Sequence, residues 1–301
     1  MNGDKPRIGF IGLGLMGHGM AKNLVTKGFP LTILLHKNRR PAEDILAAGA
    51  KEAKSAAELA RGCDVVILCV TGSPQIEDIV YREGGLLSAA RDGLLVVDTS
   101  TAEPASTARI RGDFSRKGTK YVDAPLARTP REAEEGRLNT MVGADDAAFA
   151  RLKPVLSAYC ENVIHVGPPG HGHTLKLINN FIAQAIATAT AEACAACAKS
   201  GVSIRKLHEI ISAGAVNSGI FQMMVGKMLE SGDLSGLKFT LVNAMKDLRY
   251  YTHFAESLPV PAIVGEAVHQ SLVTANLLGF GDKYVASLIE AQEKLAGVKI
   301  V

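Results

Sequence analysis

Short apolar runs alternate with amphipathic segments over the first 167 residues of the chain. Brief runs of this kind bounded by turn residues are typical of buried strands, and the stretches between most of them have helical periodicity. Strands are predicted at residues 8–11, 31–35, 65–70, 94–98, 121–123, 139–142 and 163–166. Alternation of strand and helix builds a largely parallel sheet covered on both faces. The pattern therefore predicts a doubly wound α/β Rossmann-type domain over residues 1–167.

The strand pattern stops after Pro168-Pro169-Gly170, and residues 168–301 are predicted to form an all-α domain. Helices are expected at residues 174–199, 203–213, 218–230, 241–257, 261–278 and 283–295. The first is long, and its segment 181–198 carries a single charge, Glu192. Because alanine and threonine dominate that segment and partition weakly into lipid, a helix buried between two domains is favoured over a membrane span.

Composition narrows the functional classes. A chain of 301 residues that is 47% hydrophobic and 21% charged suits a globular protein of two domains. A net charge of +3 is too small to indicate a nucleic acid partner. The start of the chain lacks the apolar stretch of a signal peptide, so we expect a cytoplasmic protein with no membrane partner. Cys194 and Cys197 lie in an alanine-rich helix without a second pair, and no metal site is predicted.

A glycine-rich turn follows the first predicted strand, with the sequence Gly12-Leu13-Gly14-Leu15-Met16-Gly17. Between a strand and a helix, G-x-G-x-x-G is typical of dinucleotide binding. The first glycine permits a tight turn, the second lets a pyrophosphate approach the backbone, and the third packs helix on strand. A simple glycine-rich turn is the alternative. We predict that Gly12, Gly14, Leu15, Met16 and Gly17 bind the cofactor.

Lys176 and Asn180 are four residues apart in the first helix of the second half. Such a pair lies on one helix face, so the ammonium and the amide can converge on one substrate oxygen. During hydride addition, negative charge grows on the carbonyl oxygen. A positioned ammonium stabilises that charge and donates a proton to the oxygen. A surface lysine beside a capping asparagine is the alternative interpretation.

Several segments in order resemble the β-hydroxyacid dehydrogenase family. They are Gly12–Gly17 with Met20-Ala21-Lys22-Asn23-Leu24, Asp98-Thr99-Ser100-Thr101, Asp123-Ala124-Pro125, Gly170–Asn180, Lys246-Asp247-Leu248 and Pro259-Val260-Pro261. The resemblance covers nearly the whole chain. It implies hydride transfer between a nicotinamide cofactor and a small anionic β-hydroxyacid or semialdehyde, with Lys176 as proton donor and Asn180 beside it. It further implies substrate contacts from Ser100, Thr101, Asn179 and Asn180, and cofactor contacts from Val70, Thr71, Thr101 and Lys246.

The segment that should meet the adenosine ribose contains no acidic residue between positions 31 and 42. An acid here would bind the ribose of NAD and repel the phosphate of NADP. The chain offers Lys37, Asn38 and Arg39 instead, and arginine suits a phosphate. We predict NADP as cofactor, with NAD as the alternative. A solvated basic turn would give the same sequence.

Arg128-Thr129 stands where most family members have a glycine-rich anion site. The pair resembles the sulfolactaldehyde reductase branch, and the several fixed donors of arginine suit a sulfonate. A carboxylate-specific semialdehyde reductase and a 3-hydroxyisobutyrate dehydrogenase are the alternatives within the family, and Arg128 could also face solvent or tie two domains together. A non-catalytic nucleotide-binding module is the alternative outside it, although Lys176 argues against it. The apolar helical half predicts a homodimer or homotetramer.

Overall fold

The computed structural model describes residues 5–36 and 38–301. The chain divides into two compact units, one ending at Lys176 and the other running from Leu177 to Val301. This division falls inside a long helix, α8 (His171–Lys199), whereas the sequence pattern placed a boundary after residue 167. The two units are described in turn.

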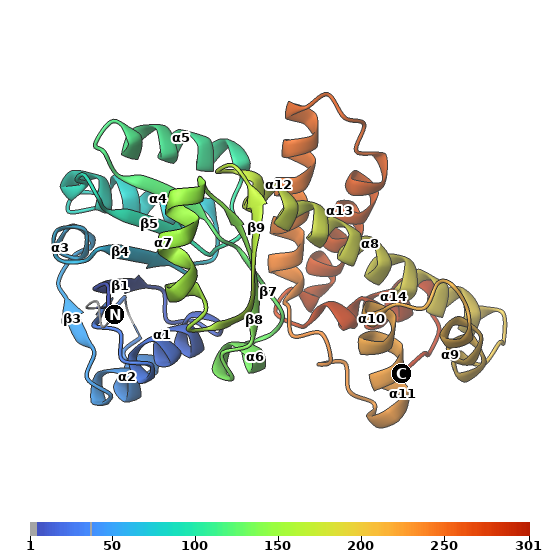
Figure 1. Ribbon diagram of the computed structural model, residues 1–301. Coiled ribbons are helices and arrows are strands. Elements are labelled where there is room, and N and C mark those ends of the chain that lie inside the picture. Colours follow the sequence, from blue (N-terminus) through green and yellow to red (C-terminus); the bar gives the residue numbers. More distant parts are fainter. Residues whose placement is uncertain (1–4, 37) are drawn as a thin grey trace. The chain divides into compact units, whose positions relative to one another are not determined.

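A nine-stranded sheet forms the centre of the first unit (Figure 1). Its strands are β1 (Ile8–Ile11), β2 (Leu31–Leu34), β3 (Lys51–Ala53), β4 (Val65–Leu68), β5 (Leu95–Asp98), β6 (Lys120–Asp123), β7 (Leu126–Ala127), β8 (Leu138–Gly143) and β9 (Cys160–Gly167). The order is β3-β2-β1-β4-β5-β6-β8-β7, with β9 paired to β8. The strands from β3 to β6 run parallel, and β8 is antiparallel to β6 and β7. The sheet confirms the predicted Rossmann-type fold.

Helices cover both faces of this sheet. They are α1 (Gly17–Thr26), α2 (Glu43–Ala47), α3 (Ala56–Gly62), α4 (Ser73–Tyr81), α5 (Pro104–Ser115), α6 (Pro130–Glu134) and α7 (Asp146–Leu156), with 3₁₀ turns at Arg40–Ala42 and Leu86–Ala89. One apolar core lies between the sheet and α1, α2 and α7. A second core lies under α3, α4 and α5 on the opposite face. Alternate side chains of the central strands supply both cores, which explains why β1 and β4 are apolar along their whole length and β5 is apolar up to Asp98, its last residue.

Two strands of the sheet were not predicted. In β3, Lys51 and Glu52 are exposed, so this edge strand lacks an apolar run. In β7 only two residues pair with β8, which is too short to leave a pattern. Both strands were missed because they lie at the margin of the sheet, where hydrogen bonding to a neighbouring strand, rather than burial, defines a strand.

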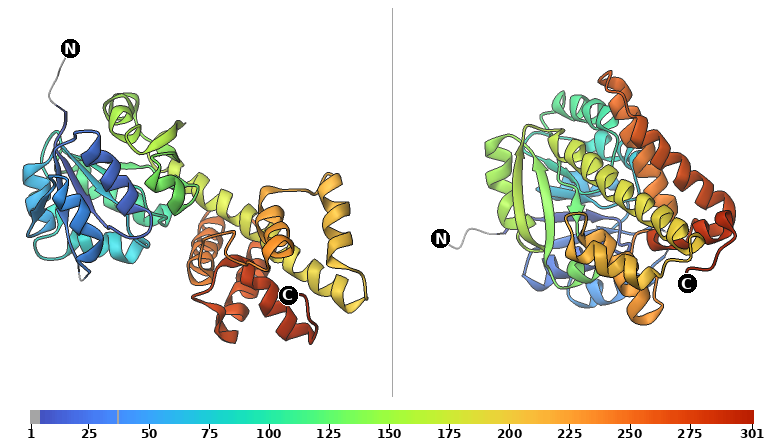
Figure 2. Two further views of the ribbon diagram at one scale, coloured as in Figure 1. Left: turned by 90° about the horizontal axis from the view of Figure 1, so that it is seen from below. Right: turned by 90° about the vertical axis from the view of Figure 1, so that its right-hand side faces the viewer.

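The second unit is helical, as predicted. It contains the rest of α8, then α9 (Ile204–Ala213), α10 (Gly219–Phe221), α11 (Lys227–Ser231), α12 (Leu241–Ser257), α13 (Ile263–Ala275) and α14 (Leu288–Ala296), with π-helical turns at Gln222–Gly226 and Asn276–Phe280 and a 3₁₀ turn at Val285–Ser287. These helices gather around the C-terminal part of α8 (Figure 2). Among the described residues of this unit, pairing of strand type is limited to one bridge, between Thr240 and Tyr284.

Helix α8 is apolar along much of its length. Among the described residues it is the one helix long and apolar enough to cross a membrane by length and composition, and 44% of its most apolar window is buried in the protein. Ala187, Ala191 and Cys194 on α8 belong to the core of the second unit. Burial raises the pKa of the Cys194 thiol to about 12, so the thiol is un-ionised and packs as a small apolar group.

Candidate active site

The glycine-rich turn between β1 and α1 has little room on its inner side. A Cβ atom on Gly12 would lie 2.1 Å from the carbonyl oxygen of Cys69, and one on Gly17 would lie 1.8 Å from that of Gly12. Gly12 also has a φ of +105°, which side chains disfavour. At Gly14 a Cβ would meet nothing within 4 Å. The turn is therefore closed toward the sheet at Gly12 and Gly17 and open at Gly14, where a pyrophosphate would approach the backbone.

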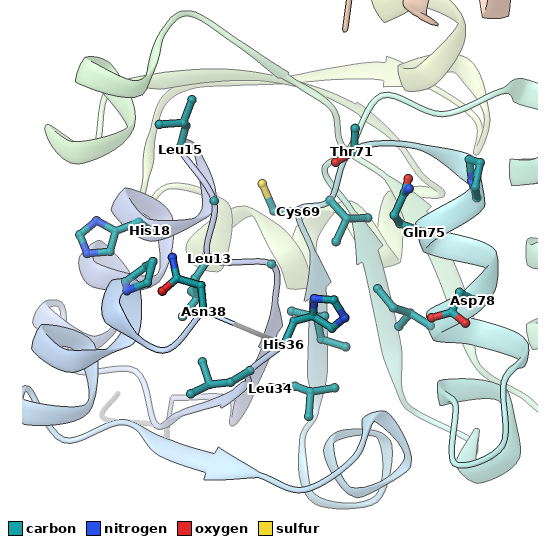
Figure 3. Close-up of a pocket in the computed structure, with 18 of the residues that line it drawn as sticks. Leu13, Leu15, His18, Leu34, His36, Asn38, Cys69, Thr71, Gln75 and Asp78 are labelled. Carbon is teal, nitrogen blue, oxygen red and sulfur yellow. The ribbon is translucent and has the colours of Figure 1, made fainter. Parts of the chain in front are cut away.

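A pocket of about 1100 Å³ opens beside this turn at the carboxyl ends of β1, β2 and β4 (Figure 3). The glycine-rich turn forms one wall, with Leu13 and Leu15. Gln75 and Asp78 of α4 stand across from it, and His36 lies between the two walls (Figure 3). Ligands of doubly wound sheets bind at this edge. The size and the bare backbone at Gly14 fit a dinucleotide, and every lining residue belongs to the first unit.

Most of the predicted cofactor residues of the first unit line this pocket. Those that do are Gly12, Gly14, Leu15, Asn38, Val70 and Thr71. Met16 and Gly17 belong to the turn and the start of α1 and are not among the lining residues. Lys37 lies outside the described residues. Lys246 belongs to the second unit.

Arg39 is not among the residues that line the pocket. Its guanidinium forms two hydrogen bonds to the carboxylate of Glu52, at 2.9 Å and 2.7 Å. The side chain of Arg39 is 63% exposed, and solvent screens such a pair so strongly that it adds little to stability. The pairing was not visible in the sequence, because Glu52 lies on β3, the edge strand that the pattern missed.

Sequence reasoning also missed a charged cluster at the start of α1. His18 lines the pocket, and its Nδ1 atom lies 2.5 Å from the Glu134 carboxylate while Nε2 lies 3.1 Å from that of Asp44. Burial disfavours the charged ring, but the hydrogen bonds to Glu134 and Asp44 outweigh it and raise the pKa of His18. The raised pKa favours the protonated ring, which lies between two carboxylates beside the glycine-rich turn. The only available signal was a histidine one residue after the third glycine.

The loop after β5 carries Ser100 and Thr101, and hydrogen bonds hold it in place. The Ser100 amide donates to Asp98 Oδ1 at 2.9 Å, and the Val70 amide donates to Ser100 Oγ at 3.0 Å. Asp98 is fully buried and Thr101 is half-buried. The loops that follow β4 and β5 are thereby joined at the carboxyl edge of the sheet.

The N-terminus of α8 is fixed to the same edge. The Asp123 carboxylate accepts hydrogen bonds from the amides of Gly170, at 2.6 Å, and His173, at 2.9 Å. A carboxylate at this position satisfies amides that have no partner within the helix and opposes the helix dipole. Lys176, half-buried, lies one turn further along α8. The predicted proton donor is therefore carried by a helix whose start is tied to β6.

Asn180 is 7% exposed and donates from Nδ2 to Asp247 Oδ2 at 2.7 Å. Lys246 donates to the other oxygen of Asp247 at 2.6 Å, and its ammonium lies 4.7 Å from the ring centroid of Tyr250. Asn180 and Lys246, predicted for separate roles, therefore share one buried carboxylate within the second unit. Asp247 was not predicted as a site residue, although it stands beside Lys246. Asn179 is exposed.

Arg128 adopts a left-handed backbone, with a φ of 83°. A left-handed backbone is the conformation that most often requires glycine. Its guanidinium donates to the Glu161 carboxylate and to the carbonyl oxygen of Arg137, and its side chain is 30% exposed. Thr129 is the N-cap of α6, and its backbone amide and its hydroxyl both donate to the Glu132 carboxylate. These hydrogen bonds lower the pKa of Glu132. An anion would have to compete with Glu161 for Arg128.

A Rossmann-type sheet with a glycine-rich turn open to a pyrophosphate, and a lysine at the end of the first unit on the helix that continues into a helical unit, are typical of a class of nicotinamide-dependent oxidoreductases. Residues 7–167 match the NAD-binding domain of 6-phosphogluconate dehydrogenase, and residues 170–291 match the NAD-binding domain of NADP-dependent 3-hydroxyisobutyrate dehydrogenase. The chain belongs to the β-hydroxyacid dehydrogenase family. It is an NAD(P)-dependent hydroxyacid dehydrogenase or aldehyde reductase.

Relatives with different names are equally similar. The 2-(hydroxymethyl)glutarate dehydrogenase of Eubacterium barkeri is 30% identical over 98% of this chain and 97% of its own. The 3-sulfolactaldehyde reductase of Escherichia coli is 30% identical over 97% of each chain. The structure of 3-hydroxyisobutyrate dehydrogenase from Salmonella typhimurium superimposes with a TM-score of 0.81 at 27% identity, covering 94% of this chain and 99% of that one.

Proposed function

We propose that the protein interconverts a small anionic semialdehyde and the matching hydroxyacid, with Lys176 as the proton donor and acceptor. The observation that carries this is the placement of Lys176 one turn beyond an α8 N-terminus that Asp123 ties to the sheet edge bearing the cofactor pocket. When bound, the nicotinamide supplies or accepts the hydride. Lys176 protonates the oxygen as negative charge develops on it, and its charge is most useful at that moment.

Asn180, Asp247 and Lys246 act as a supporting group in this proposal. Asp247 accepts from both neighbours, so it fixes the orientation of the Asn180 amide and holds the Lys246 ammonium. Asn180 then holds the substrate oxygen, or Lys176 itself, from the same helix. Lys246 binds the cofactor. Substrate contacts come in addition from Ser100, Thr101 and Asn179.

We propose NADP as the preferred cofactor, with NAD as the alternative. The support is the lack of an acid between positions 31 and 42 together with Asn38 and His36 on the pocket wall. Arg39 can join them, because its pair with Glu52 is exposed to solvent and opens at little cost. The ammonium of Lys37, in this proposal, adds to the same phosphate site.

For the substrate's anionic group we propose Arg128, assisted by Thr129, and a sulfonate as the group. The support is an arginine with several fixed donors at a backbone position that favours glycine. The relatives do not choose, because one named for a sulfonate and one named for a dicarboxylate are both 30% identical. A carboxylate-specific semialdehyde reductase or a 3-hydroxyisobutyrate dehydrogenase remains the alternative.

We also propose a homodimer or homotetramer. Three aliphatic side chains of the second unit, Ile210, Ile263 and Leu277, are 72%, 80% and 83% exposed. Such side chains favour burial against another surface. A single species of monomer mass in light scattering at micromolar concentration would contradict this.

The test of the function is turnover of matched sulfonate and carboxylate semialdehydes with NADPH and NADH, comparing the native protein with Lys176→Ala. We expect turnover to fall by about 10²–10⁴-fold while the cofactor dissociation constant stays within a few-fold. Lys206→Ala is the matched control, since Lys206 is exposed and pairs only with Glu209 among the contacts the structure gives it. Retention of more than about a tenth of turnover by the Lys176 variant would contradict the proton-donor role.

A further inference from the structure

His173 is buried in the first turn of α8 and has no place in the chemistry described so far. Its side chain is 0% exposed. The Nδ1 atom lies 2.7 Å from the Thr107 hydroxyl of α5, and Nε2 lies 3.6 Å from Asp98 Oδ2. That separation is longer than a hydrogen bond. Nε2 is accordingly one of the few buried polar atoms among the described residues that lack a hydrogen bond.

Asp98 connects this histidine to the Ser100–Thr101 loop, to which the proposed function assigns substrate contacts. One of its oxygens accepts from the Ser100 amide and the other accepts from the Tyr121 hydroxyl at 2.7 Å. Burial and the neighbouring Asp98 raise the pKa of Tyr121, so its hydroxyl keeps the proton that it donates. Asp98 is thus an acceptor on both oxygens, and the atom facing it from α8 is Nε2 of His173.

At Nδ1 the Thr107 hydroxyl can donate to the ring, or accept from it while donating to the carbonyl oxygen of Glu103, so the group facing Nε2 decides where the proton lies. An unprotonated Nε2 would direct a lone pair at a buried carboxylate, whereas Nε2–H directs a donor at it. A buried donor and a buried acceptor that do not reach each other cost free energy. Polar contacts at active sites are often long before ligands bind and shorten in the complex. We propose that His173 is a positioning residue: Nε2–H, through Asp98, ties the Ser100–Thr101 loop to the first turn of the helix that carries Lys176.

In this proposal, the connection through Asp98 positions Lys176 relative to the substrate. Lys176 must meet the same substrate carbonyl whose carbon faces the nicotinamide, and a misplacement of about 1 Å can cost about 10²-fold in rate. Asp123 fixes where α8 begins, but it acts through backbone amides and does not reach the loop after β5. His173 supplies the connection between the two, and all of its partners lie within the first unit.

Two substitutions separate this role from simple filling of space. In Asn the side-chain amide reaches only the Nδ1 position, so His173→Asn keeps the Thr107 contact and loses the one to Asp98. In Gln the amide reaches the Nε2 position, so His173→Gln keeps a donor facing Asp98. We expect His173→Gln to retain kcat within about threefold and His173→Asn to lower kcat about tenfold or more, with the cofactor dissociation constant unchanged in both. Equal losses in the two variants, or full activity of His173→Asn, would overturn the proposal.

A second measurement uses the native protein and does not depend on a variant's folding. Two-bond ¹H–¹⁵N correlation of histidine-labelled protein reports which ring nitrogen carries the proton. We expect Nε2 of His173 to be protonated, and a lone pair on Nε2 would overturn the proposal. The kinetic arm rests on the proposed reductase function, whereas the spectroscopic arm does not. Failure of native turnover on every semialdehyde would therefore count against the function alone, and the NMR result would still decide the role of His173.

Discussion

Asp123→Asn is expected to weaken the attachment of α8 far more than a carboxylate-to-amide change usually does. Each Asp123 oxygen accepts one backbone amide, from Gly170 and from His173. An amide side chain has one acceptor oxygen, so one of these N–H groups would face an NH₂ group instead. A hydrogen bond to a charged group is worth about 1.5–3 kcal/mol, and an unpaired buried donor costs about 1–3 kcal/mol.

The substitution should therefore lower the free energy of unfolding by about 2–4 kcal/mol. No rearrangement relieves the loss easily, because Gly143 and Gly172 press against the carboxylate so closely that even a Cβ on either would lie within 2.8 Å of it. Asp145→Asn is the matched control, since Asp145 caps α7 through the amide of Ala148 and otherwise forms an exposed ion pair with Lys120. Asparagine and aspartate are about equal as N-caps and an exposed ion pair is worth little, so this control should cost no more than about 1 kcal/mol.

Urea unfolding followed by circular dichroism gives both free energies, and amide hydrogen exchange locates the effect. We expect exchange in Asp123→Asn to accelerate over the first turn of α8, with the change decaying along the helix. Turnover should fall as well, because Lys176 lies one turn beyond the cap. A loss of stability no greater than that of Asp145→Asn would refute the account of this attachment.

Three further outcomes are expected. Arg39→Ala should raise the KM for NADPH and spare that for NADH. Glu52→Gln should lower the KM for NADPH by up to about fivefold, because it releases Arg39 from a weak, exposed pair; equal effects on both cofactors would contradict a phosphate role. The pKa of His18 is raised on folding, so its contribution to stability is full below the unfolded pKa near 6.5 and is lost as pH rises through the folded pKa. In thermal melts, His18→Asn should reduce the fall of melting temperature with pH across that window, and an unchanged pH dependence would contradict the account. Asp247→Asn should lower kcat/KM at least about tenfold, because it removes the charge that holds Lys246 and reorients the Asn180 amide; a change below about twofold in steady-state assays would place Asp247 outside the site.

The sequence predicted the fold wherever burial leaves a periodic trace. β1 and β4 are apolar throughout, β5 is apolar up to Asp98 at its end, and the apolar residues of the long helices of the second unit recur with helical spacing. β3 was missed because an edge strand shows its polar residues to solvent. The same exposed strand supplies Glu52, so missing it also hid the partner of Arg39.

The candidate site was predictable where backbone geometry demands a residue type. Gly12 and Gly17 are required by close carbonyl contacts, and these leave a motif. Contacts between side chains far apart in sequence leave none. His173 meets Asp98 and Thr107 across more than sixty positions, and spacing could not show that. Asp247 belongs to the segment Lys246-Asp247-Leu248, but its contact with Asn180 comes from another helix and is not visible in that segment.

The backbone at Arg128 bears on how this chain can change. A non-glycine residue in the left-handed region costs about 1–2 kcal/mol, and glycine would remove that cost. Variation selected for thermal tolerance alone would therefore drift toward glycine at this position, and variation selected for turnover of one anion would hold arginine there. Under the proposed role of Arg128 in anion binding, this is a position where stability and substrate choice oppose each other.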